Sequence, residues 1–226
     1  MDSIAFIKQL GPGIPALEYD RYVALQTRLR DRRRECVLFC SHPPTITAGV
    51  QAQSANLRSG PDRLDSARIQ LVRVGRAGDH TAHEPGQCVI YPHVDLRRRA
   101  LGVVDFFDIL LQTTARALAV VWNVAVESRK SAPGLYRMSD GAKLVSIGIM
   151  FKSFFTSYGL AVNVDNDMQT FRHIHPCGFA DQRIGSIYEG GQDPKRLPEF
   201  LDCWSAEFRQ RLEAAGATAR VADPIG

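Results

Sequence analysis

The stretch YGLAVNVDNDMQTFRHIHPCGF, residues 158–179, starts like a β-strand and ends with a cysteine between a proline and a glycine. Its strand-like part, SYGLAVNV (157–164), follows a second strand-like run, KLVSIGIMF (143–151), across the short connection KSFFT. The two runs therefore predict an antiparallel hairpin. The cysteine, Cys177, follows the hairpin, and it is a metal ligand, a nucleophile or a small residue at the end of a strand.

The rest of the chain mixes helices and strands without the regular alternation of a doubly wound sheet. Apolar spacing and turn residues predict a helix over 18–30, a buried strand over 36–40, a strand over 69–79 that returns as a strand over 88–96, a helix over 103–122 and a helix over 198–214. Asp105 is placed to cap the helix over 103–122, whose apolar stripe runs to Val120. We therefore predict one α+β or mixed α/β domain over residues 1–226, with its chemistry in loops beside the sheet.

Length and composition are typical of one soluble domain. The chain has 226 residues, of which 45% are hydrophobic, enough for one substantial core. No basic segment followed by an apolar run opens the sequence, and no run approaches the ~20 apolar residues of a membrane span. The five cysteines include no CxxC pair, and Cys36 and Cys40 fall in the buried strand. These features predict a cytoplasmic protein with reduced thiols and no membrane association.

The net charge is +4, and arginines concentrate in RLRDRRR (28–34) and RRR (97–99). Runs of this kind are usually solvated helix ends or loops. Their functional interpretation is a basic rim that steers an acidic partner toward the protein. Nucleic acid is not expected as a partner, because the 8% of aromatic residues are not interleaved with the arginines as a stacking surface requires.

A metal site would use His173, His175 and Cys177, because alternate residues of a strand point to the same side. Pro176 weakens regular strand geometry there, and the other paired histidines, His80 and His83, have no carboxylate at a suitable spacing. No P-loop or dinucleotide-binding glycine pattern is present either. We therefore expect neither a metal nor a nucleotide cofactor.

A nucleophilic cysteine needs an exposed sulfur, a base and donors for an oxyanion. The Pro-Cys-Gly turn can present the thiol of Cys177, and the glycine after it lets an acyl group approach the backbone. The base must come from elsewhere, and His83, His175 and a lysine remain candidates. Lys143, at the start of a strand, is by itself an ordinary strand-edge residue.

Four stretches carry a family resemblance: HPPTITAG (42–49), RAGDHTAHEPGQCVIYP (76–92), KLVSIGI (143–149) and YGLAVNVDNDMQTFRHIHPCGF (158–179). Together they resemble the lipoyl(octanoyl)transferase family, whose enzymes move an octanoyl group from acyl carrier protein to a lysine of lipoyl domains. The fourth stretch is similar, position by position, to the family signature Gly-x-Ala-x-Asn-x-x-x-Asp-x-x-x-Phe-x-x-Ile-x-Pro-Cys-Gly.

The resemblance implies a mixed sheet flanked by helices, the fold of lipoate ligases and biotin protein ligases. It implies that Cys177 accepts the acyl group and that Lys143 is the general acid and base, without cofactor or metal. The substrate-binding residues that it implies are Arg76, Ala77, Gly78, Asp79, His80, Thr81, Ala82, His83, Ser146, Ile147, Gly148, Tyr158, Gly159, Leu160, Ala161 and Asn163.

The resemblance also implies the partners. Acyl carrier protein would be the donor, and lipoyl domains of 2-oxoacid dehydrogenases or the glycine cleavage H protein would be the acceptors. Both kinds of partner are acidic in the family, which gives the arginine runs a use in steering. We expect the protein to act as a monomer.

Several positions depart from the family pattern: Ala77 and Glu84 replace glycines, Ala82 replaces Tyr, Tyr158 replaces His, and Gly185 replaces Thr. Side chains at 77 and 84 are expected to narrow a turn that approaches the substrate. Two other interpretations stay open: a diverged acyltransferase for another acyl carrier or acceptor, and an acyl-binding or interaction module without turnover. An ATP-dependent ligase is disfavoured, since it needs no nucleophilic cysteine.

Overall fold

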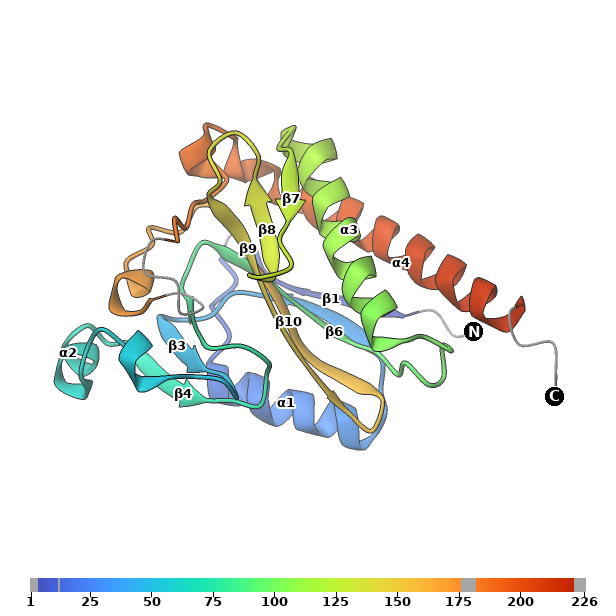
Figure 1. Ribbon diagram of the computed structural model, residues 1–226, viewed down its shortest axis with the longest axis horizontal. Helices are drawn as coiled ribbons and strands as arrows, with labels where there is room; N and C mark the ends of the chain where they lie inside the picture. The colour runs from blue at the N-terminus through green and yellow to red at the C-terminus, as the bar shows by residue number, and fades with distance from the viewer. Residues whose placement is uncertain (1–3, 12, 176–181, 222–226) are drawn as a thin grey trace.

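The computed structural model of the protein describes residues 4–11, 13–175 and 182–221, with side chains up to residue 216. Seven strands of this described part form one mixed sheet: β1 (Ala5–Gln9), β2 (Cys36–Cys40), β6 (Gln87–His93), β7 (Val126–Ser128), β8 (Gly134–Arg137), β9 (Lys143–Lys152) and β10 (Phe155–Asn163). They follow the order β1-β2-β6-β10-β9-β8-β7, in which only β1 and β2 are parallel neighbours. The long strands β9 and β10 cross the middle of the molecule (Figure 1).

The predicted hairpin is formed by β9 and β10. Lys152 pairs with Phe155, so Ser153 and Phe154 alone connect the strands. Their φ angles are 51° and 61°. Two successive positive φ angles are typical of a type I′ turn, whose twist matches the right-handed twist of the flanking strands. The prediction of a hairpin is confirmed, with a shorter loop than KSFFT.

Helices cover both faces of the large sheet (Figure 1). The described helices are α1 (Tyr19–Asp31), α2 (Pro61–Ser66), α3 (Val103–Trp122) and α4 (Leu197–Val221), with short 3-10 turns at Ser54–Asn56, Thr170–His173, Tyr188–Gly190 and Pro194–Arg196. Along β6, Cys88 and Ile90 pack in the core beneath α3 and α4, whereas Val89 and Tyr91 pack against α1. This alternation follows from the two-residue period of a strand. Both cysteines of β2 are buried, as predicted.

A second, smaller sheet contradicts one sequence prediction. It consists of β3 (Thr45–Ala48), β4 (Gln70–Arg73) and β5 (His80–His83), in the order β4-β3-β5. The strands predicted within 69–79 and 88–96 are present as β4 and β6, but the prediction that the second returns alongside the first is wrong, because β4 pairs with β3 and β6 belongs to the large sheet. The intervening HTAH became β5, although it lacks the apolar alternation that marks strands in a sequence.

Three details of the helices also differ from expectation. Gly102 occupies the N-cap of α3 without a side-chain hydrogen bond, and Asp105 lies in the first turn, where its charge favours the helix dipole. Val120 is half-exposed and does not belong to the buried stripe. The last helix begins at Leu197 and extends to Val221, beyond the predicted end at 214.

No described helix combines the length and hydropathy that crossing a bilayer requires.

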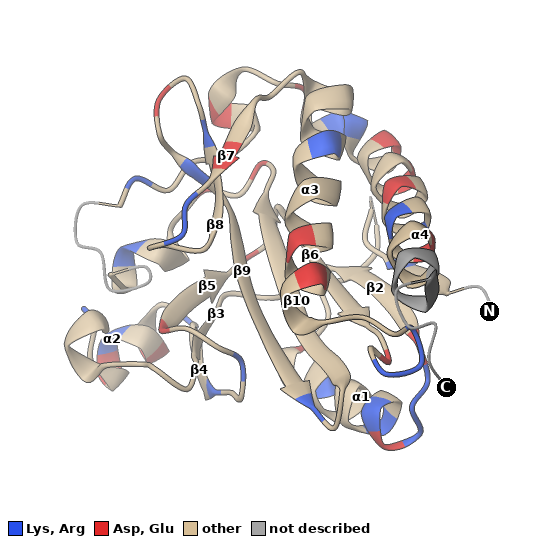
Figure 2. Cartoon of the chain, turned by 45° about the vertical axis from the view of Figure 1, so that its right-hand side comes forward, with Lys and Arg blue, Asp and Glu red and all other residues tan. Residues whose placement is uncertain are grey.

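The two arginine runs fold against each other. The Arg33 Nε donates to Asp95 Oδ2 (2.7 Å), and the buried Arg99 donates from Nε to Glu35 Oε1 (2.7 Å). The Arg33 guanidinium also donates to the Ser153 carbonyl at the tip of the β9–β10 hairpin. Figure 2 shows basic residues of α1 close to that tip. Part of this charge is therefore used within the fold, and a steering role for the runs stays a prediction.

Candidate active site

Small side chains on β9 and β10 form the floor of a pocket. Ser146 is directly opposite Ala161, and Gly148 is directly opposite Gly159. Residues directly opposite each other in an antiparallel pair share one face of the sheet. A Cβ on Gly148 would lie 3.0 Å from the Ala77 carbonyl oxygen, so the loop before β5 packs closely on this face. Because these floor residues are small, a narrow, mainly apolar pocket remains between the large sheet and that loop.

Most of the predicted substrate-binding residues come together in this pocket. Its lining includes Arg76, Ala77, Gly78, Asp79, His80, Thr81, His83, Ser146, Ile147, Gly148, Tyr158, Gly159, Leu160 and Ala161. Two predicted residues lie beside the pocket and not in its lining. Ala82 packs in the core of the small sheet, and the Asn163 amide accepts a hydrogen bond from Gln87 (2.9 Å) and donates to the Gly185 carbonyl (3.1 Å).

Sequence reasoning missed three lining residues, Tyr19, Val89 and Tyr91. The Tyr19 ring lies 5.8 Å from the His83 ring, and Tyr91 stacks on Tyr22 at 3.7 Å, both measured between centroids. Tyr19 belongs to α1 and the other two to β6. Val89 and Tyr91 stand within the family-like stretch 76–92 but were not assigned to the site. No local pattern marks Tyr19, because its approach to the pocket depends on how α1 packs across the sheet.

A wider cavity of about 590 Å³ lies on the other side of the loop. It is bounded by Ala77, Gly78, Asp79, Ile147 and Gly148, which it shares with the narrow pocket, and by Gln51, Gln53, Asn56, Phe107, Ser131, Ala132, Pro133, Ile149 and Phe151. The segment from Ala77 to Asp79 therefore forms a partition between the two spaces.

This partition is held from both sides. Arg76 is buried, and its Nη2 donates to the carbonyl (2.6 Å) and the hydroxyl (2.7 Å) of Thr47 on β3. The Ala77 N–H donates to the Ile149 carbonyl on the edge of β9 (3.2 Å). Gly78 has a φ of 90°, whereas Ala77 has no positive φ. The alanine therefore replaces a glycine without backbone strain.

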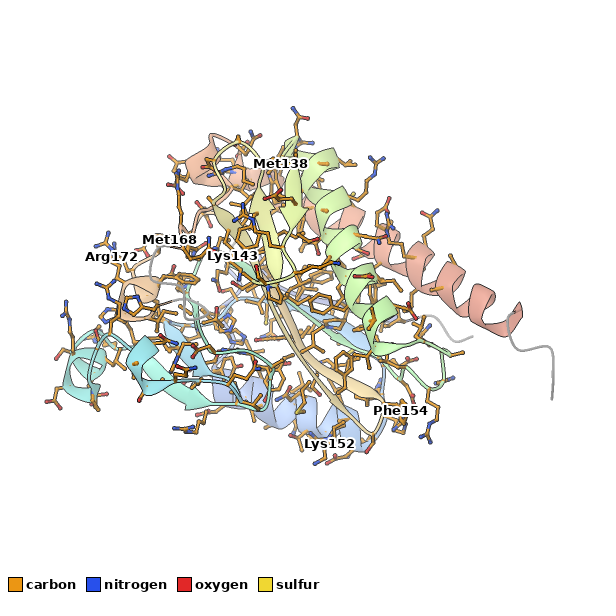
Figure 3. The ribbon with its side chains drawn as sticks, in the orientation of Figure 1. Met138, Lys143, Lys152, Phe154, Met168 and Arg172 are labelled. Atoms are coloured by element: carbon orange, nitrogen blue, oxygen red, sulfur yellow. The ribbon has the colours of Figure 1, made fainter. Side chains whose placement is uncertain are left out.

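Lys143, the first residue of β9, is 1% exposed. Its Nζ lies 5.5 Å from the centre of the Tyr136 ring, and its side chain runs past Gly134. A Cβ on Gly134 would lie 2.6 Å from the Lys143 Cε, so the glycine makes room for the lysine. Figure 3 shows Lys143 deep among the side chains near the middle of the molecule. Ser146, where the pocket begins, is three positions further along β9.

The predicted nucleophile, Cys177, lies outside the described residues. On one side of it, the His175 N–H donates to the carbonyl of Asn56, a residue that lines the wider cavity (2.7 Å). On the other side, the Arg183 carbonyl accepts a hydrogen bond from the Lys143 N–H (2.9 Å). The described residues that flank the predicted nucleophile therefore lie at the cavity and at the predicted general base.

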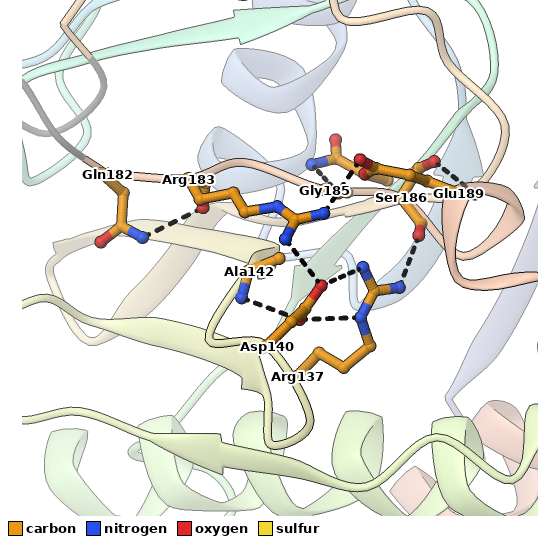
Figure 4. A network of polar contacts seen from close by, with 9 residues as sticks. Arg137, Asp140, Ala142, Gln182, Arg183, Gly185, Ser186 and Glu189 are labelled. Carbon is orange, nitrogen blue, oxygen red and sulfur yellow. Dashed lines mark hydrogen bonds and ion pairs between the residues drawn. The ribbon is translucent and has the colours of Figure 1, made fainter.

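A polar network connects residues 183–189 to the turn between β8 and β9 (Figure 4). Arg137 donates from two nitrogens to the Asp140 carboxylate (3.0 and 2.9 Å) and from Nη1 to the Ser186 carbonyl (3.0 Å). Arg183 bridges Asp140 and Glu189 at 3.2 Å each. The hydrogen bonds from Arg137 hold the pKa of Asp140 at about 2, below its usual value. The carboxylate is thus ionised at neutral pH.

The glycine at position 185 fits this network. A Cβ there would lie 2.9 Å from the Ala142 Cβ and 3.3 Å from the Arg137 Nη2. The Gly185 N–H donates to the Lys143 carbonyl (3.1 Å). A threonine would crowd the guanidinium, so the departure from the family pattern accompanies the buried arginine.

Glu84 has a different role from the one expected for it. Its carboxylate is buried and lines neither cavity. It accepts hydrogen bonds from the Asn166 side chain (2.8 Å) and from the Thr170 N–H (2.8 Å). The expectation that Glu84 narrows a turn next to the substrate is therefore wrong. The residue ties the end of β5 to the segment that leads toward Cys177.

We expect Glu84→Ala to destabilise the protein by about 2–4 kcal/mol, because two buried donors, on Asn166 and Thr170, lose their acceptor. The melting temperature should fall by about 5–15 °C in thermal unfolding. Glu213→Ala, on the exposed side of α4, is the matched control and should change it by less than ~2 °C. Equal melting temperatures for the two variants would contradict the role given to Glu84.

Two histidines near the pocket, His42 and His83, are buried and uncharged at neutral pH. Nδ1 of His42 donates to the Leu17 carbonyl (2.6 Å), so its Nε2 accepts from the Tyr91 hydroxyl (2.9 Å). Burial lowers the pKa of His42 to about 4 and that of His83 well below its usual value. The His173 ring bonds to the Ser59 hydroxyl (2.8 Å). Within the described ranges, His, Cys, Asp and Glu side chains form no group that fits a metal ion.

Residues 14–209 match the family described as the lipoyl protein ligase A/B catalytic domain. The chain belongs to this family. An octanoyltransferase of Leptospira interrogans is 43% identical over 87% of this chain and 93% of its own length. An octanoyltransferase of Bacteroides fragilis is 33% identical over 78% of this chain and 77% of its own length. The predicted kinship with octanoyltransferases, and with it an enzyme of the transferase class, is confirmed.

Solved structures of lipoate protein ligases have the same fold. A lipoate-protein ligase A bound with ATP superposes with a TM-score of 0.69 at 10% identity, covering 96% of this chain and 94% of that one. A bipartite lipoate protein ligase of Thermoplasma acidophilum, studied with its E2 lipoyl domain, gives 0.68 at 12% identity, with 96% and 92% covered. The predicted class of a mixed sheet flanked by helices is confirmed.

Proposed function

We propose that this protein takes an octanoyl group from acyl carrier protein onto Cys177 and passes it to a lysine of a lipoyl domain. The observation that carries the proposal is the narrow apolar pocket on β9 and β10, which begins three positions from the buried Lys143. The family and its octanoyltransferase members supply the reaction class.

The reaction has two acyl transfers. In the first, the Cys177 sulfur attacks the carbonyl carbon of the donor thioester, and the carbon–sulfur bond to the carrier's prosthetic thiol breaks. Lys143 takes the proton from the cysteine and returns it to the departing thiol. One thioester replaces another, so this exchange is nearly isoenergetic.

In the second transfer, the neutral amine of the acceptor lysine attacks the Cys177 thioester. An amide forms, the Cys177 sulfur leaves, and Lys143 carries the amine proton to it. The amide is more stable than the thioester, so this step is downhill.

The acceptor is a lipoyl domain, the kind of partner named with the Thermoplasma ligase. An acyl carrier protein donor, a monomeric state, a cytoplasmic location and a single domain over residues 1–226 stay predictions. The wider cavity beside Asn56 and Asp79, with a volume of about 590 Å³, is the space that we assign to the phosphopantetheine arm of the acyl carrier protein.

The test is intact-protein mass spectrometry after incubation with octanoyl acyl carrier protein in the absence of ATP. We expect the mass of the protein to rise by one octanoyl group. Addition of a lipoyl domain should then remove this group from the protein and raise the mass of the lipoyl domain by the same amount. An adduct from a different acyl donor alone would indicate a diverged acyltransferase. Octanoylation of the lipoyl domain only when ATP and free octanoate are supplied would indicate a ligase. The absence of transfer under all of these conditions would contradict an acyl-transfer function.

A further inference from the structure

Tyr158 is turned out of the regular pattern of β10. It pairs with Ile149, yet Ile149 packs in the core beneath α3 and α4 whereas Tyr158 packs on the opposite face with Tyr22 and Tyr91. Directly paired residues normally share a face. The φ of Tyr158 is 62°, and this left-handed backbone directs its side chain to the pocket face. Such a conformation costs about 1–2 kcal/mol in a residue other than glycine, and strain of this kind gathers at functional sites.

The Tyr158 side chain is held firmly on that face. Its hydroxyl accepts a hydrogen bond from the Gly75 N–H (3.2 Å), and its ring stands edge-on to the Tyr22 ring at 6.1 Å between centroids. Its own N–H donates to the Tyr22 hydroxyl (3.0 Å), and the residue is 5% exposed. These contacts restrain the ring on the pocket face.

Tyr158 stands between two spaces. It lines the narrow pocket, and it also lines a surface groove whose other residues come from α1, β4 and the segments that follow β3 and β4, among them Val23, Val72 and Gly75. Removing the ring would join the pocket to this groove. The groove would then extend the pocket away from the sheet toward α1.

The ring lies at the end of the pocket remote from Lys143. Its partner Ile149 is six positions from Lys143 along β9, and three positions, or ~10 Å at ~3.3 Å per residue, from Ser146, where the pocket begins. Lys143 therefore lies before the start of the pocket on β9, and Tyr158 lies at its other end. The small residues Ser146, Gly148, Gly159 and Ala161 lie between them. An extended octanoyl chain is about 9 Å long, given carbon–carbon bonds of ~1.5 Å.

We propose that Tyr158 is the end wall of the acyl pocket and sets the longest chain that this enzyme accepts. The inference rests on the proposed function, because it takes the narrow pocket as the acyl site. The carbonyl end of the chain lies toward Lys143, and the terminal methyl group meets the Tyr158 ring. Medium chains fit against this wall, and longer chains are excluded by it.

The test compares wild type with Tyr158→Gly and Tyr158→Phe. Glycine removes the ring and relaxes the positive φ, whereas phenylalanine keeps the ring and removes only the hydrogen bond to Gly75. Each protein receives equal amounts of octanoyl, decanoyl and dodecanoyl acyl carrier proteins, and intact mass gives the rate of each adduct. If thermal unfolding shows that the Tyr158→Gly variant does not fold, Tyr158→Asn takes its place, because asparagine also tolerates a positive φ.

We expect the ratio of dodecanoyl to octanoyl adduct to rise at least ~10-fold in Tyr158→Gly and to change less than ~2-fold in Tyr158→Phe. An unchanged ratio in the glycine or asparagine variant, with normal octanoyl adduct in wild type, would overturn the end wall and leave the proposed function intact. Failure of wild type to accept any of the three chains would overturn both.

Discussion

Cys177→Ser is expected to lower octanoyl transfer to a lipoyl domain by at least ~10⁴-fold, the scale seen when a covalent nucleophile is removed. A serine hydroxyl is a far weaker nucleophile than a thiolate at neutral pH. The other cysteines offer no substitute. Burial raises the pKa of Cys36 to about 11 and also raises the pKa values of Cys40, Cys88 and Cys203.

The matched control is Cys203→Ser, the same substitution on α4 at a half-buried position. It should keep transfer within ~3-fold of wild type. The measurement is the steady-state rate of lipoyl-domain octanoylation, together with sensitivity of the adduct to neutral hydroxylamine, which cleaves thioesters. Retention of full transfer by Cys177→Ser would disprove the covalent mechanism.

Lys143→Met is expected to lower kcat/KM for the same transfer by about 10²–10⁴-fold, the usual contribution of a general acid and base. Methionine fills the space that Gly134 leaves for the lysine side chain but carries no proton to exchange. Lys143→Arg should be equally inactive, because the larger guanidinium does not fit beneath Gly134 and does not release its proton.

Lys152→Met is the control, since Lys152 is the exposed residue at the other end of the same strand. It should keep wild-type transfer. A loss of the pH dependence of kcat/KM in Lys143→Met, with an unchanged melting temperature, would separate proton transfer from a structural role. Transfer within ~3-fold of wild type in Lys143→Met would contradict its assignment as general acid and base.

The fold was predictable from the sequence where the signals are local. The hairpin of β9 and β10 and the helices over 18–30 and 103–122 follow from apolar spacing and turn residues, which need no distant partner. The small sheet was not predictable in this way. Its strand β5 is four residues long and polar, and it is a strand because β3 pairs with it.

The site, like the fold, was predictable from the sequence only in part. The sequence by itself determined which residues carry the family pattern, including Lys143 and the residues around the pocket, because their identities and spacing are written in the chain. Only the tertiary structure decided what the departures do. Glu84 meets Thr170 across 86 residues of chain. Tyr158 faces the pocket through its backbone conformation and not through the alternation of its strand. Contacts between distant residues and the direction of a side chain depend on how the sheets pack together, and no local spacing encodes that.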